Sequence, residues 1–152
     1  MAIDSSGQWW VGSAPADIQN YLEAYTRSEG AYPATVCRVV RCHCGSDRFR
    51  LERADDATRR TCVACGHIHL ICRNAEDWEE AEAEEGVEPY SCIACNAKEA
   101  NLTVGFASYE DPQIDAVKWF YVGVRCAMCG ILSCFNDGKV GCGPASEVYE
   151  SV

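Results

Sequence analysis

Apolar and charged residues alternate in the stretch DRFRLERADDATRRTC, at residues 47–62. Phe49 and Leu51 are separated by charged side chains, and the alternation breaks at Asp55 and Asp56. A period of two is typical of a strand with one buried face, and adjacent aspartates favour a turn. This pattern predicts two antiparallel strands joined by a turn at Asp55-Asp56.

A second stretch with strand character covers residues 101–126. Its first half predicts a strand with three apolar positions, Leu102, Val104 and Phe106. The segment YEDPQID predicts a turn, and a second strand follows through Trp119, Tyr121 and Val124. The next apolar run, GILSCF, predicts a third strand that ends at a turn in NDG, residues 136–138.

The acidic segment NAEDWEEAEAEEG predicts a helix between these two regions. Asn74 is a good N-cap, the early acids suit the positive end of the helix dipole, and Gly86 is a stop signal. Trp78 and Ala81 form its only apolar stripe. We expect this helix to link the two strand-rich regions.

The N-terminal arm predicts another helix, which begins near Ser13 and Pro15 and ends at Gly30. Its apolar positions fall on one face, at Ile18, Tyr21, Leu22 and Tyr25. Trp9 and Trp10 precede it. An apolar face of this size needs a surface to cover, so the helix either packs on the strands that follow or docks on another protein. We favour the first alternative.

Twelve cysteines in 152 residues indicate disulfides or metal, and most of them are paired closely along the chain. We call each close pair, with the residues between, a knuckle. The four knuckles are C-x-C-G at Cys42 and Cys44, C-x-x-C-G at Cys62 and Cys65, C-x-x-C-N at Cys92 and Cys95, and C-x-x-C-G at Cys126 and Cys129. Thiols in a reducing cytosol stay reduced, so paired thiols favour metal over disulfides.

Two knuckles supply four thiolates, which suit tetrahedral Zn²⁺ with no open coordination position. A glycine after the second cysteine lets the backbone turn with positive φ and point amides at the sulfurs. The hypothesis is therefore two zinc ions per chain. The first would bind Cys42, Cys44, Cys62 and Cys65, and the second would bind Cys92, Cys95, Cys126 and Cys129.

Residues 37–140 resemble the zinc-ribbon superfamily. The resemblance rests on C-x-C-G-S-x-x-F at 42–49 and on the C-x-x-C knuckles at 62, 92 and 126. It implies a three-stranded antiparallel fold around each ion and no particular activity. The first knuckle lacks one spacer residue, and Asn96 stands where glycine is usual.

The predicted fold class is a small metal-stabilised β (α+β) fold. It has two antiparallel zinc-ribbon units joined by the acidic helix, with the N-terminal helix packed on them. TCVACGHIHLIC and RCAMCGILSCF share a knuckle, an apolar strand and a later cysteine, which favours two related units. The expected segments are an N-terminal arm at 1–36, a first ribbon at 37–73, the linker helix at 74–90, a second ribbon at 91–140 and a tail at 141–152.

Four cysteines lie outside the knuckles. Cys37 precedes Cys42 by five residues and is an alternative ligand for the shortened first knuckle. Cys72 and Cys134 are interpreted as small apolar side chains on buried strands, and Cys142 as an exposed thiol in a glycine-rich stretch. His43, His67 and His69 fall in the first ribbon, and we interpret His67 and His69 as exposed polar residues at a sheet edge rather than ligands.

The chain carries a net charge of −10, distributed unevenly. Residues 37–73 carry +4 with eight arginines, and residues 74–90 carry −8 without a single base. So negative a chain is repelled by nucleic-acid phosphates, which disfavours a nucleic-acid partner. The arginines of the first ribbon have two interpretations: they lie on solvated strand faces, or they form a surface that binds nucleic acid.

No motif of a hydrolase, metalloprotease, phosphate-binding loop or zinc deaminase occurs, so the sequence favours a protein that is not an enzyme. The first hypothesis is a zinc-stabilised adaptor that binds another protein. The alternatives are a nucleic-acid-associated regulator using the first ribbon, and a redox protein with iron in a Cys₄ site. No secretory signal is visible and the apolar runs are too short to span a bilayer, so the expected location is cytoplasmic.

Overall fold

The computed structural model describes residues 3–28, 32–140 and 144–152 of the chain. The strands are β1 (Ile3–Asp4), β2 (Val11–Gly12), β3 (Val36–Val39), β4 (Phe49–Ala54), β5 (Ala57–Cys62), β6 (Ile68–Ile71), β7 (Glu88–Pro89), β8 (Ala100–Ser108), β9 (Val117–Cys126) and β10 (Leu132–Lys139). The helices are α1 (Asp17–Ser28), α2 (Ala75–Glu85) and α3 (Ala145–Tyr149).

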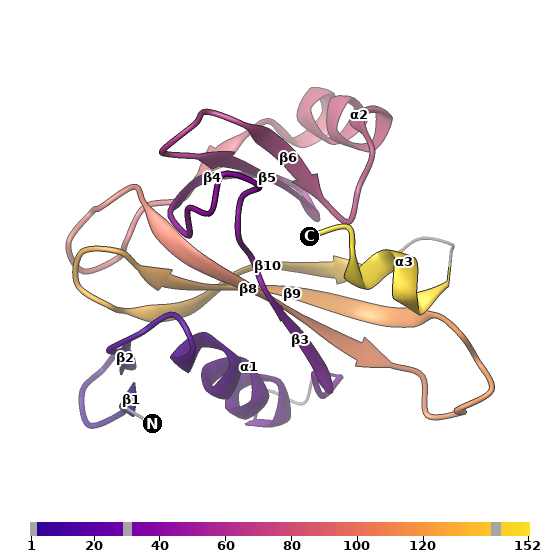
Figure 1. Cartoon of the computed structure of the whole chain (residues 1–152), viewed down its shortest axis with the longest axis horizontal. Coiled ribbons are helices and arrows are strands. Elements are labelled where there is room, and N and C mark those ends of the chain that lie inside the picture. Colours follow the sequence, from indigo (N-terminus) through magenta and orange to yellow (C-terminus); the bar gives the residue numbers. More distant parts are fainter. Residues whose placement is uncertain (1–2, 29–31, 141–143) are drawn as a thin grey trace.

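Both cysteine-bearing regions contribute to one antiparallel sheet. Its strand order is β10-β9-β8-β4-β5-β6, and β3 and β7 pair with β8 and β4 at the side of this path (Figure 1). Strands β4–β6 and β8–β10 are two runs of three consecutive antiparallel strands, as predicted for each region. The two runs meet where Phe49 pairs with Ala100. The sequence predicted separate units, whereas the strands of both join in this sheet.

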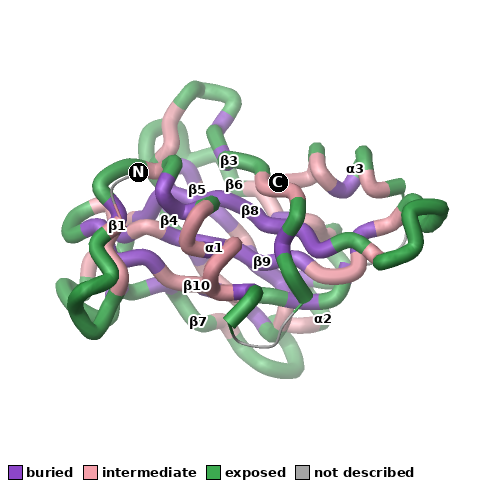
Figure 2. Tube along the Cα trace, turned by 90° about the horizontal axis from the view of Figure 1, so that it is seen from below, coloured by how far each residue is buried: buried purple, intermediate pink, exposed green. Residues whose placement is uncertain are grey.

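Strand β8 and most of β9 are buried on both faces. On one face, Ile18 and Leu22 of α1 pack with Tyr121 of β9. On the other, Phe120 and Val122 of β9 join the main hydrophobic core with strand residues from both regions. Figure 2 shows α1 beside β9, whose trace is largely buried. The N-terminal helix therefore packs on the sheet, which is the alternative that we favoured.

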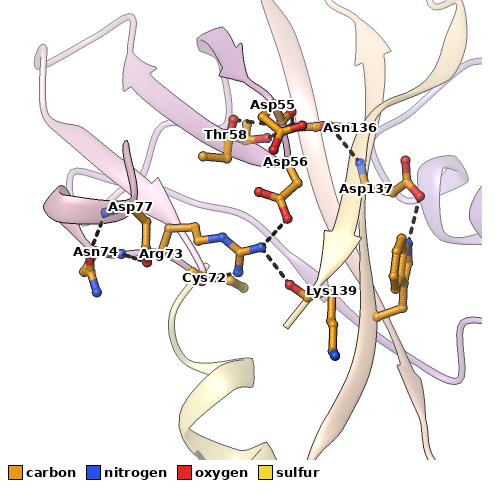
Figure 3. Close-up of polar contacts among 12 residues, drawn as sticks. Asp55, Asp56, Thr58, Cys72, Arg73, Asn74, Asp77, Asn136, Asp137 and Lys139 are labelled. Carbon is orange, nitrogen blue, oxygen red and sulfur yellow. Dashed lines mark hydrogen bonds and ion pairs between the residues drawn. The ribbon is translucent and has the colours of Figure 1, made fainter. Parts of the chain in front are cut away.

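Side chains connect β10 to the turn between β4 and β5. The amide of Asn136 donates to the backbone oxygens of Asp55 and Ala57 and to the hydroxyl of Thr58. The Arg73 guanidinium donates to Asp56 (2.9 Å) and to the backbone oxygen of Lys139 (2.7 Å) (Figure 3). The sheet therefore curls, so that β10, at one end of the strand order, lies against the β4–β5 hairpin.

These contacts explain why the turn predicted at NDG is wrong. Strand β10 continues through it to Lys139, with Asn136, Asp137 and Gly138 paired to β9. A Cβ at Gly138 would lie 2.7 Å from the Cβ of Asp56, so glycine is needed here for close approach rather than for a turn. Local turn propensity is overridden by the contacts with Asp55–Thr58.

The acidic helix begins and ends as predicted. Asn74 caps α2 through its side chain, which accepts from the Asp77 amide, and Asp77 bonds back in a capping box. Gly86 follows with positive φ. Trp78 is buried against Ala54 and Ala57. The N-terminal helix α1 spans Asp17–Ser28, and its predicted stop at Gly30 lies outside the described residues.

The C-terminal segment, predicted as a tail, contains α3. Val148 belongs to the main core, and the Tyr149 ring lies 5.1 Å from that of Phe106. The backbone oxygen of Ser151 accepts from the amide of Cys72. This segment is therefore packed on the strands of both regions. Among the described residues, none of the helices is both long enough and apolar enough to cross a membrane.

Candidate metal centres

The eight knuckle cysteines gather into two clusters of four, and the sulfur atoms within each lie within 4.8 Å of one another. The first holds Cys42, Cys44, Cys62 and Cys65, and the second holds Cys92, Cys95, Cys126 and Cys129. In each region, one knuckle precedes the first strand and the other connects the second strand to the third. Strand pairing therefore brings together residues that are far apart in the sequence.

The sulfur separations fit a tetrahedral ion and are longer than a disulfide bond. In the first cluster, Cys42 and Cys65 are 3.5 Å apart, and Cys44 and Cys62 are 3.6 Å apart. The corresponding pairs of the second cluster, Cys92–Cys129 and Cys95–Cys126, are both at 3.5 Å. A tetrahedron with metal–sulfur bonds of about 2.3 Å has sulfurs about 3.8 Å apart, whereas a disulfide bond measures about 2.05 Å.

Each cluster is anchored in the core on one side only. The first cysteine of every knuckle is buried and the second is exposed. Cys42, Cys62, Cys92 and Cys126 all belong to the main hydrophobic core. An ion held between the two kinds of cysteine would therefore join the sheet to the exposed ends of its loops.

All four knuckles share one backbone turn. In each knuckle, the amide of the residue after the second cysteine donates to the backbone oxygen of the first cysteine, at 2.8–2.9 Å. These residues are Gly45, Gly66, Asn96 and Gly130. All four residues have positive φ, between 63° and 93°. Asparagine tolerates this conformation better than other residues with a side chain, so the departure at Asn96 preserves the turn. Lys98 and Ser91 hydrogen-bond to its side-chain oxygen.

Backbone amides also favour the thiolate form of one cysteine in each cluster. Hydrogen bonds from the amides of Cys65 and Ala64 lower the pKa of Cys62 to about 6. Burial raises the pKa of Cys126, but the amides of Cys129 and Met128 outweigh it and bring the pKa to about 7. Because the thiolate is the form that binds metal, Cys62 and Cys126 favour ligation. Burial and the neighbouring cysteine sulfurs instead raise the pKa of their knuckle partners, Cys65 and Cys129.

Within the described residues, neither cluster includes a further cysteine or a histidine. Cys37 lies in β3, where it pairs with Gly105 of β8, and it is not part of the first cluster. Cys72 and Cys134 are half-buried; Cys134 lies in β10, whereas Cys72 follows β6 with φ of 56°. Cys142 lies outside the described residues. Of the histidines, His67 is exposed, as expected, but His69 is half-buried and bonds to the Ser151 oxygen.

The arginines of the first region are largely engaged within the protein. Arg53 pairs with Glu88, Arg59 with Glu52, and Arg73 with Asp56. In the described part of the chain, none of the ion pairs uses a carboxylate of α2. Helix α2 contacts this region through Trp78, whose ring lies against the Arg59 guanidinium. Less of this region is therefore free to bind phosphates than its sequence suggested.

The sequence did not reveal the contact between the N-terminal arm and the second cluster. The amide of Gly12 donates to the Gly130 oxygen at 2.8 Å, and Val11 bridges to Ile131. Arg125 donates to the oxygens of Gly12 and Ser13. All of these contacts use backbone atoms of the arm, so the side chains of the arm could not indicate them.

A Cys₄ site offers four soft sulfur ligands and leaves no position for water or substrate, so such a centre stabilises a fold rather than activating a molecule. Comparison with protein-family models, with curated proteins and with solved structures finds no significant match to the chain. Inference about function therefore depends on the two clusters and on the surface around them.

Proposed function

We propose that the protein is a structural-zinc adaptor, built from two zinc-ribbon units within one sheet, that binds another protein near its second metal centre. Sulfur-only ligands in a tetrahedral arrangement suit zinc or iron, and of the two we propose zinc. Closed sites support a role of the metal in stability, so we attribute recognition of a partner to the protein surface.

The observation that carries the adaptor proposal is apolar exposure at the second centre. Ile93 and Met128 stand inside its two knuckles, with 69% and 73% of their surface exposed. Exposed large apolar side chains at one place are typical of interaction sites. Trp9 is 40% exposed and, with Ile93, lines a groove of about 370 Å³. Tyr90 and Phe135 also line this groove and contact each other edge to face.

The metal part of the proposal predicts two zinc ions per chain. Elemental analysis of protein purified without added metal should give two zinc atoms and no iron, and the solution should be colourless. One ion or none per chain, or mass spectrometry that finds the knuckle cysteines in disulfides, would contradict it. Iron with a visible absorption band would favour the redox alternative instead.

The adaptor part predicts that the exposed apolar residues carry binding. Replacing Ile93 and Met128 with serine should reduce capture of the protein's partners at least about tenfold, because buried apolar anchors dominate interfaces. Ile114→Ser is the matched control, since Ile114 is 47% exposed but lies in the turn between β8 and β9. Quantitative mass spectrometry after affinity capture would compare the three proteins at equal zinc content.

Two results would count against the adaptor. Equal recovery of every partner by the double variant and by Ile114→Ser would show that Ile93 and Met128 do not carry binding. Recovery of DNA or RNA, with an affinity that falls steeply with salt, would favour the nucleic-acid alternative. That alternative uses the exposed arginines of the first region, among them Arg38, Arg41 and Arg50.

A further inference from the structure

Arg60 is the one buried basic side chain among the residues that the structure describes, with 6% of its surface exposed. Strand β5 places it two positions before Cys62, so both side chains lie on the face of the strand that joins the main core. The neighbouring strand gives the same placement, because Cys62 pairs with Phe49. The Arg60 guanidinium carbon lies 5.0 Å from the centre of the Phe49 ring.

The hydrogen bonds of Arg60 leave part of its charge without a direct partner. Its Nε donates to the Val152 oxygen at 2.9 Å, which fixes the direction of the guanidinium. Its Nη1 is buried and has no hydrogen-bond partner. A buried cation of this kind is costly unless an opposite charge lies nearby. The first cluster can supply that charge, because Cys62 lies two positions along the same face of β5 and pairs with Phe49, the ring over which the guanidinium lies. Cys42 and Cys62 interact electrostatically with Arg60 when they are ionised.

The second cluster has a different environment. Arg125, the residue before Cys126, uses all three of its nitrogens on protein oxygens, namely those of Gly12, Ser13 and the Asn101 side chain. Successive residues of a strand point to opposite faces, so Arg125 lies on the face of β9 opposite to Cys126. Tyr90 is the polar residue buried beside this cluster, and burial and the neighbouring thiolates raise its pKa. The two centres are thus alike in ligands and unlike in surroundings.

We propose that Arg60 is the counter-charge of the first metal centre and that it makes the two centres unequal in metal affinity. Loading a Cys₄ site with Zn²⁺ displaces the protons that its thiols still carry and leaves a net charge of −2, which is more negative than the metal-free site. A fixed cation beside the site stabilises this product more than the less negative metal-free cluster, so it strengthens metal binding. Arg60 acts on the metal through the thiolates and is a positioning residue, not a ligand.

The proposal rests on metal occupancy of both clusters, and its test separates the two ideas. With Cd²⁺ as the probe ion, the wild-type protein should give two cadmium NMR resonances, one for each centre. Fewer than two resonances would contradict the metal proposal itself. In Arg60→Met, which keeps the apolar stem, the resonance of the first centre should shift and that of the second should stay in place.

Competition with a zinc chelator supplies the second readout. Arg60→Met should lower the zinc affinity of one centre about tenfold, and Arg60→Lys should restore most of it because the charge returns. Arg59→Met is the matched control, since Arg59 lies on the opposite face of β5 and pairs with Glu52. Unchanged resonances and affinities in folded Arg60→Met would overturn the proposal.

A third variant covers the case in which Arg60→Met does not fold. Arg60→Gln keeps a hydrogen-bond donor near the Val152 oxygen and loses the charge, whereas Arg60→Lys keeps the charge and loses the planar guanidinium. We expect the first centre to be weaker in Arg60→Gln than in Arg60→Lys. Equal affinities in these two variants would show that packing, and not charge, is the contribution of Arg60.

Discussion

Replacing Cys62 or Cys126 with serine should unfold most of the chain and not only the region that carries the change. Binding of structural zinc contributes about 10–16 kcal/mol in small zinc-finger peptides, which is as large as the whole net stability of a typical domain, about 5–15 kcal/mol. Both cysteines are buried members of one hydrophobic core that combines strand residues from the two regions. Losing one centre therefore removes packing that supports the other.

The measurement is far-ultraviolet circular dichroism with zinc content determined on the same sample. Each variant should lose more than half of the native signal and hold less than two zinc ions per chain. Cys37→Ser is the matched control, because Cys37 is half-buried in β3 and outside both clusters. It should keep both ions and the native spectrum. A Cys62→Ser protein that retains two ions and the native spectrum would show that the ligand assignment is wrong.

The cysteine clusters could be predicted from the sequence because their signals are local. A knuckle needs a short spacer and a residue that accepts positive φ, and both can be recognised within five positions. The turn at Asp55-Asp56 and the capping of α2 by Asn74 are local for the same reason, and the structure confirms both. The strands of the first region followed from the alternation of apolar and charged residues, and those of the second from apolar runs bounded by turn signals.

The joining of the two regions could not be predicted, since it depends on contacts between distant segments. Phe49 pairs with Ala100, and Asn136 bonds to the β4–β5 turn, across 51 and 78 to 81 positions of sequence. Nothing in the NDG segment indicates that the Asn136 side chain donates hydrogen bonds to the β4–β5 hairpin. The burial of Arg60 could not be predicted either, because in the sequence it is one of eight arginines and burial is a property of the assembled sheet.

Gly130 and Gly66 occupy equivalent knuckle positions and should respond very differently to alanine. Their φ angles are +80° and +78°, so alanine meets the same backbone strain at both, about 1–2 kcal/mol. A Cβ at Gly66 has no neighbour within 4 Å. A Cβ at Gly130 would lie 2.6 Å from the backbone oxygen of Gly12 and 3.2 Å from Val11. A backbone oxygen cannot rotate away, so the N-terminal arm must move.

That movement should break the hydrogen bond between Gly12 and Gly130 and the one from Arg125 to Gly12. Overpacking adds about 1–3 kcal/mol to the strain, so the free energy of unfolding should fall by about 1–2 kcal/mol in Gly66→Ala and by about 2–5 kcal/mol in Gly130→Ala. Urea unfolding of the two zinc-loaded variants, followed by tryptophan fluorescence, measures the difference directly. Equal losses in the two variants would mean that the arm does not rest on the second knuckle. A larger loss in Gly130→Ala, with both zinc ions retained, would show that the arm stabilises the sheet through its contact with that knuckle.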